Sequence, residues 1–133
     1  MRKTFILLLK SYIMAEHNEL GKEGEKMARE YLIEKGFKII DTNWRFGSDE
    51  IDIVAKYNNY MVVVEVKSRK SSFIAEPEIA VNKAKQKFLI RAAQQYAVQR
   101  NVEEEIRFDI VSIVMGNDKP IIKHIEDAFY PTL

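Results

Sequence analysis

The sequence of 133 residues contains no cysteine, only five glycines and three prolines, and two isolated histidines, His17 and His124. The lack of cysteine excludes disulfide staples, thiolate zinc sites and a cysteine nucleophile. It fits a reducing compartment, so we expect a cytoplasmic location. Neither a phosphate-binding P-loop nor a dinucleotide-binding glycine motif occurs, which argues against nucleotide hydrolysis and dinucleotide redox chemistry and predicts no small-molecule cofactor.

A long apolar run is also missing at the N-terminus. The run Phe5–Leu9 follows two cations, as in a signal peptide, but it is shorter than the roughly 7–15 residues of such a segment and far below the about 20 of a membrane span. We therefore expect no membrane partner. Because Met14 opens a stretch that resembles a protein start, we interpret residues 1–14 as an upstream-start extension or flexible N-terminal segment and residues 15–133 as one domain. The alternative for the first segment is a short membrane-touching or docking helix.

An excess of charge of one sign is absent too, since 21 Lys and Arg oppose 20 Asp and Glu. Net charge therefore predicts neither a nucleic-acid nor a membrane partner, and any electrostatic function must come from local segregation. Such segregation exists: residues 67–91 hold seven cations against two glutamates. This basic stretch directly follows an acidic one.

The periodicity of apolar residues predicts two helices and five strands. Helical spacing covers Leu20 to Lys35, with a stop at Gly36, and a second helix runs from Lys83 to Arg100 with Asn82 as its cap. Strands are expected over residues 37–46, 50–55, 60–67, 107–114 and 121–125, with a loop over 68–72 and a helical turn at Pro77. The order αβββαββ indicates an α/β (α+β) fold with a mixed central sheet flanked by helices.

Two acids face each other in the predicted hairpin. If Asn58 and Asn59 form the turn, Asp52 lies opposite Glu65 and Glu50 lies opposite Lys67, all on one sheet face. Opposed carboxylates repel, so something must offset the repulsion. A divalent cation between them, a shared proton on a raised pKa, or an ordinary surface neutralised by nearby cations would each do so.

The residues of this hairpin resemble a known nuclease signature. Ile51-Asp52, twelve further residues and Glu65-Val66-Lys67 are similar to the PD-(D/E)xK motif of the restriction-endonuclease-like superfamily. The wider frame from Glu19 to Val114 resembles the YraN-like family of small bacterial proteins. It includes Gly21-Lys-Glu-Gly24-Glu25, Asn43-Trp-Arg45, Glu50-Ile-Asp-Ile-Val-Ala55, Lys85-Gln86 and Arg107-Phe-Asp-Ile-Val111. Ile51 replaces the proline of the superfamily name, and Asp49 is an extra acid without an assigned role.

The resemblance implies a restriction-endonuclease-like fold and a metal-dependent endonuclease that hydrolyses DNA phosphodiester bonds, in structured, branched or single-stranded DNA. Asp52 and Glu65 would hold Mg²⁺ or Mn²⁺, and Lys67 would position the attacking water or stabilise developing charge. Glu25 matches a helix glutamate that contributes to the metal site in related junction resolvases, or it is simply solvent-exposed. Glu50 would support Lys67, or form a plain cross-strand ion pair with it.

Nucleic-acid contacts are expected from Arg45, Arg69, Lys70, Lys85 and Gln86. Lys85 and Gln86 lie near a helix N-terminus, where backbone N–H groups favour phosphate; a solvated helix face is the alternative for individual lysines. A homodimer would suit a four-way junction, by analogy of fold only. The alternative function is a non-catalytic nucleic-acid-binding accessory protein of the same fold.

Overall fold

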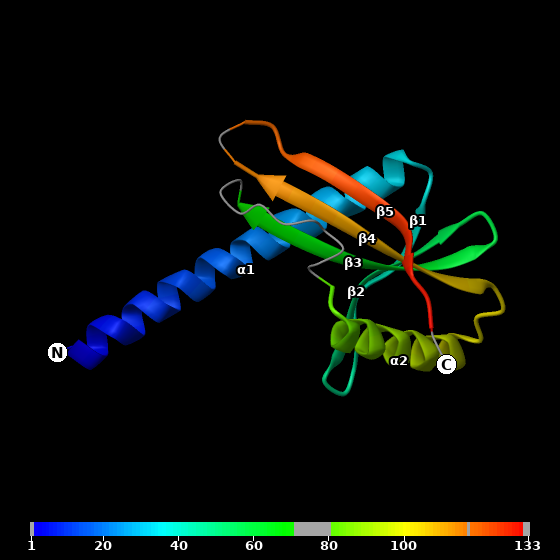
Figure 1. The fold of residues 1–133 in the computed structure, drawn as a ribbon, viewed down its shortest axis with the longest axis horizontal. Helices are drawn as coiled ribbons and strands as arrows, with labels where there is room; N and C mark the ends of the chain where they lie inside the picture. The colour runs from blue at the N-terminus through cyan, green and yellow to red at the C-terminus, as the bar shows by residue number, and fades with distance from the viewer. Residues whose placement is uncertain (1, 71–80, 117, 132–133) are drawn as a thin grey trace.

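A computed structural model describes residues 2–70, 81–116 and 118–131 (Figure 1). The elements follow the predicted order, which is confirmed: α1 (Arg2–Glu34), β1 (Lys38–Phe46), β2 (Asp49–Tyr57), β3 (Tyr60–Lys70), α2 (Lys83–Arg100), β4 (Glu105–Met115) and β5 (Ile121–Phe129). The helical turn predicted at Pro77 lies outside the described residues.

The strands form one five-stranded mixed sheet in the order β1-β2-β3-β4-β5. Strands β3 and β4 are parallel, and the other neighbouring pairs are antiparallel. Since parallel neighbours need a crossover, α2 lies between β3 and β4 in the chain. This α+β arrangement is compatible with the predicted restriction-endonuclease-like fold.

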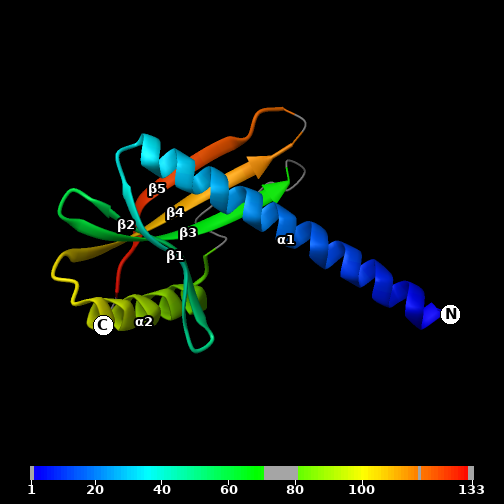
Figure 2. The ribbon, with the colours of Figure 1, turned by 180° about the vertical axis from the view of Figure 1, so that it is seen from behind.

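The two helices cover opposite faces of the sheet (Figures 1 and 2). Ala28 and Leu32 of α1 are fully buried in one apolar cluster with strand residues such as Val64. Leu89 and Tyr96 of α2 belong to a second cluster on the other face. From Ile53 onward the residues of β2 alternate between the two clusters, with Ile53 and Ala55 on the α1 side and Val54 on the α2 side.

Helix α1 is much longer than expected. It begins at Arg2 rather than at Leu20, and its N-terminal half projects away from the sheet (Figures 1 and 2). The large apolar side chains between Phe5 and Met14 are 44–67% exposed. The helix ends where predicted: Gly36 has φ +95°, and the amide of Phe37 bonds back to the carbonyl of Leu32 at 2.9 Å. No helix in the described ranges is long and apolar enough to cross a membrane.

One further expectation is corrected at the end of β3. Residues 68–70, expected in a loop, extend β3, because β4 offers parallel partners as far as the pair Lys70↔Met115. Phe88 of α2 is 46% exposed, and the guanidinium of Arg91 lies 5.0 Å from its ring centroid. The cap is confirmed, since the side chain of Asn82 accepts from the amide of Lys85 at 2.9 Å.

Candidate active site

The predicted hairpin register is confirmed from the turn up to the pair Ile53↔Val64, where the regular β2–β3 pairing ends. Beyond this point β2 continues alongside β1, and β3 continues alongside β4. The amide of Val66 donates to Asp52 Oδ2 at 2.9 Å, beyond the end of the β2–β3 ladder. The acids therefore lie at a fork between two strands, and the expected ladder pairs of Asp52 with Glu65 and of Glu50 with Lys67 are not formed.

Both acids of the fork sit in surroundings that disfavour their ionised forms. Burial raises the pKa of Asp52 to about 6, helped by the negative charges of Glu25 and Glu50 and opposed by the hydrogen bond from Val66. Burial and then the charge of Asp52 raise the pKa of Glu65 to about 7. The charge of Asp52 thus acts on Glu65, although the ladder pair that the hairpin register predicted is not formed.

Glu65 is only 5% exposed, yet its carboxylate is poorly satisfied. Its Oε2 atom is buried and has no hydrogen-bond partner among the described residues. Its Oε1 atom lies 3.8 Å from Lys85 Nζ, which is an ion pair too long for a hydrogen bond. A buried charge in this state is costly unless a cation or a proton joins it.

Helix α1 brings Glu25 towards the fork because Gly24 allows a close approach to β3. A Cβ atom on Gly24 would lie 2.9 Å from Ser68 Cβ and would overlap Ser68 Oγ. Glu25 is half-buried, and its charge reaches Asp52. Within the described ranges, however, no three His, Cys, Asp or Glu side chains are grouped so that they could hold one metal ion. The direct metal role of Glu25 stays a prediction.

The predicted partner of Lys67 is engaged elsewhere. Glu50 pairs with Arg45 across the β1–β2 ladder, with 3.7 Å between Arg45 Nη2 and Glu50 Oε2. Lys67 is half-buried on β3, and its charge acts on Glu65. The cation of the predicted motif therefore remains beside the acid pair without Glu50 as its partner in the sheet.

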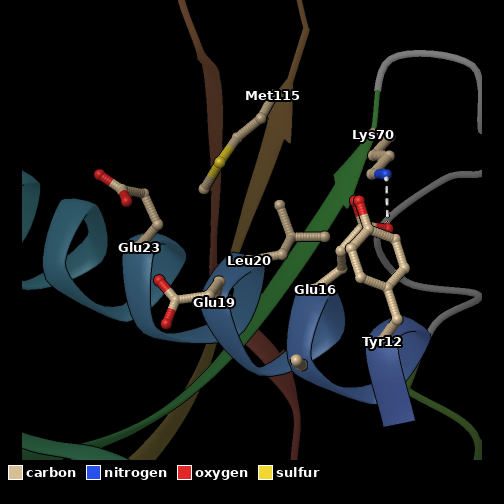
Figure 3. A pocket seen from close by; sticks show the side chains of 8 residues that line it. Tyr12, Glu16, Glu19, Leu20, Glu23, Lys70 and Met115 are labelled. Atoms are coloured by element: carbon tan, nitrogen blue, oxygen red, sulfur yellow. Dashed lines mark hydrogen bonds and ion pairs between the residues drawn. The ribbon is translucent and has the colours of Figure 1, made fainter. Parts of the chain in front are cut away.

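The other predicted phosphate contacts are spread over two regions. Lys85 and Gln86 lie in the first turn of α2, and Gln86 Nε2 donates to the carbonyl of Val81 at 3.1 Å. Arg69 and Lys70 end β3. Figure 3 shows Lys70 beside Glu16 of α1, with 3.9 Å between Lys70 Nζ and Glu16 Oε2. A hollow between α1 and the ends of β3 and β4 adjoins this ion pair; it is lined by Tyr12, Ala15, Glu16, Glu19, Leu20, Glu23, Lys70 and Met115.

Sequence reasoning missed the partner of Asp49, the extra acid of the motif. Arg91 donates two hydrogen bonds to it, at 2.7 and 2.8 Å, and these lower the pKa of Asp49. The bidentate pair ties the start of β2 to α2. Only the fold brings these residues together, because 42 positions separate them.

Asp109 is the centre of a buried hydrogen-bond network, and His124 gains in it a partner that its isolation in the sequence hid. Arg107 donates two hydrogen bonds to Asp109, both at 2.9 Å, and His124 Nε2 lies 2.8 Å from Asp109 Oδ2. Burial alone would raise the pKa of Asp109, but the hydrogen bonds from His124 and Arg107 outweigh it and lower that pKa. The spacing of Arg107 and Asp109, two apart on one strand face, was the available signal.

Comparison with known proteins gives a consistent family. The profile described as "Uncharacterised protein family UPF0102" matches residues 24–113. A UPF0102 protein of Phocaeicola vulgatus is 46% identical over 120 residues, which is 90% of this chain and 99% of the relative. One from Bacteroides thetaiotaomicron is 48% identical with the same coverage, and one from Thermodesulfovibrio yellowstonii is 47% identical over 84% of this chain and 96% of the relative.

Proposed function

The chain belongs to the UPF0102 (YraN-like) family, and from the geometry of its acidic fork we propose that it is a metal-dependent endonuclease. Its substrate would be DNA in a branched, otherwise structured or single-stranded form. The observation that carries the proposal is the buried pair of Asp52 and Glu65, set at the point where two strands separate, with Lys67 beside it. Acids kept together with raised pKa values in this way are typical of functional sites.

The donor set of the fork suits a hard divalent cation. Mg²⁺ is usually held by one or two carboxylates, with water and substrate phosphate oxygens completing its coordination. Asp52 and Glu65 would supply the carboxylates for Mg²⁺ or Mn²⁺, and the unpartnered Oε2 of Glu65 is the atom that most needs a cation. Glu25 is the candidate for a further ligand from α1. When bound, such an ion would polarise the phosphodiester and lower the pKa of a water molecule.

The protein's own side chains would divide the remaining work. The amide of Val66 fixes the orientation of Asp52 at 2.9 Å. Lys67 would orient the attacking water or stabilise the charge that develops on the phosphate. Arg45, Arg69, Lys70, Lys85 and Gln86 would hold the DNA backbone, and a homodimer would present two such sites to a four-way junction.

One observation favours a second candidate, a non-catalytic nucleic-acid-binding accessory protein. The described residues offer no group of three acids for a metal, and Lys85 already stands beside Glu65. In that case the same cations would bind phosphates, and the acid pair would remain without a catalytic metal. The binding would still weaken steeply with salt, because phosphate contacts release counterions.

The test incubates the purified full chain with junction, flap, single-stranded and duplex DNA in Mg²⁺ or Mn²⁺. Asp52→Asn and Lys67→Met should each abolish cleavage, whereas Glu103→Gln, in an exposed position distant in the sequence from the fork, should leave it unchanged. Cleavage that survives both site substitutions would refute the enzyme. Salt-sensitive binding without cleavage by the unmodified chain would establish the accessory protein instead.

A further inference from the structure

Lys85 is the cation whose charge acts on both acids of the fork. Its Nζ lies 3.8 Å from Glu65 Oε1, and its positive charge also reaches Asp52. It comes from α2, whereas Lys67, the cation of the predicted motif, lies on β3. The ammonium group of Lys85 therefore already neutralises part of the negative charge at the proposed site of the divalent cation.

The contact is built so that the ammonium can leave. At 3.8 Å it is Coulombic, without a hydrogen bond to hold it. The Lys85 side chain is 38% exposed, whereas the Glu65 side chain is 6% exposed. A lysine carries its charge on a flexible four-carbon stem, so the head can move while the buried carboxylate stays.

The backbone beneath Lys85 is fixed, which limits where the ammonium can go. Asn82 caps the helix by accepting from the amide of Lys85 at 2.9 Å, and Gln86 is tied to the carbonyl of Val81. The side chain thus pivots from the first turn of α2, beside a helix N-terminus that attracts anions. An anion arriving at the fork would meet this ammonium.

We infer that Lys85 is the resident counter-ion of the acid pair, which a divalent cation displaces and which then binds a phosphate oxygen of the DNA. The inference rests on the proposed function, because it assumes that metal and DNA meet at this fork. It adds a coupling: the metal releases the lysine that recognises the substrate. Lys85 is in this view a positioning residue. It stabilises the folded protein while the acid pair holds no metal, and it links metal occupancy to DNA affinity.

The first measurement is Mn²⁺ affinity, from the electron paramagnetic resonance signal of unbound Mn²⁺ at constant pH and ionic strength. Lys85→Met removes the competing charge at nearly constant length, so it should bind Mn²⁺ about tenfold more tightly than the unmodified chain. Lys87→Met, an exposed lysine of the same helix, is the matched control and should bind as the unmodified chain does. Equal or weaker Mn²⁺ binding by Lys85→Met would overturn the inference while leaving the proposed function intact.

The second measurement is the melting temperature in EDTA. Lys85→Met should lower it, and the loss should vanish in a Glu65→Gln background, where no charge needs a counter-ion. An equal loss in both backgrounds would overturn the inference, since Lys85 would then act by packing alone.

The third measurement is affinity for junction DNA in Ca²⁺. Lys85→Met should bind this DNA several-fold more weakly and with a shallower salt dependence, and unchanged affinity would overturn the phosphate role of Lys85. Failure of the unmodified chain to bind Mn²⁺ at all would be distinguishable, because it would defeat the proposed metal site itself and the exchange with it.

Discussion

The approach of α1 to β3 at Gly24 makes a sharp prediction about two glycines of one helix. In Gly24→Ala the new methyl group would lie 2.9 Å from Ser68 Cβ and overlap the hydroxyl, so the helix or the strand must move. Overpacking of this kind costs about 1–3 kcal/mol, and the better helix propensity of alanine returns about 1 kcal/mol. We expect a net loss of stability, seen as a melting temperature lower by several degrees.

Gly21→Ala is the matched control, because nothing lies within 4 Å of the Cβ it would add. This substitution gains the helix propensity without the overlap, so it should stabilise the protein by about 1 kcal/mol. The two single substitutions, one turn apart on the same helix, should therefore change the melting temperature in opposite directions.

A double substitution identifies the cause. Ser68→Gly removes both atoms that the methyl group would strike, which leaves Met115 Cε at an ordinary 3.7 Å. In the Ser68→Gly background, Gly24→Ala should stabilise the protein as Gly21→Ala does. The assay is thermal or urea unfolding followed by circular dichroism. If Gly24→Ala proves as stable as Gly21→Ala in the unmodified background, the reasoning about close approach is refuted.

Three further predictions concern charge and the N-terminus. The pKa values of Asp52 and Glu65 are raised in the folded state, so the unfolding free energy in EDTA should fall by a few kcal/mol as pH rises from about 4 to about 7. Glu65→Gln should make this dependence on pH shallower. An unchanged dependence in Glu65→Gln would contradict the prediction. Asp109→Asn removes the charge that faces Arg107 in a buried network and should cost about 3 kcal/mol in urea unfolding, an expectation that a loss as small as that of exposed Asp118→Asn would disprove. Removal of residues 1–13 should leave the melting temperature within about 1 °C and reduce aggregation on size exclusion, since their apolar side chains are exposed; a large drop in melting temperature would show that they support the fold.

Most of the fold could be predicted from residues that are close together in the sequence. The Asn82 cap, the stop at Gly36 and the hairpin register each depend on residues close in sequence, and each is confirmed. The end of the hairpin ladder could not be predicted, because beyond it β2 pairs only with β1 and β3 pairs only with β4. The extension of β3 past residue 67 has the same origin, since β4 supplies its partners.

In the candidate site, too, local proximity could be predicted and long-range contacts could not. The register alone predicted Asp52 opposite Glu65; this ladder pair is not formed, but the charge of Asp52 still acts on Glu65. The pair of Asp49 with Arg91 and the ion pair of Glu65 with Lys85 were out of reach, because each joins α2 to the sheet across a long stretch of chain. Sequence patterns indicated which residues carry charge, but not how distant helices distribute their cations among the acids.

The hydrogen bond from Val66 to Asp52 changes how substitutions and relatives should be interpreted. Asp52 accepts a hydrogen bond from the amide of Val66 beyond the end of the β2–β3 ladder, so an alanine at position 52 removes a partner of the backbone together with any chemistry. A relative that had lost all activity would still be under selection to keep an acceptor at this position. If relatives were found to retain Asp52, this would therefore be weak evidence for catalysis. Retention of Glu65 is the more informative trait, because its buried Oε2 has no hydrogen-bond partner among the described residues and is costly to the stability of the fold.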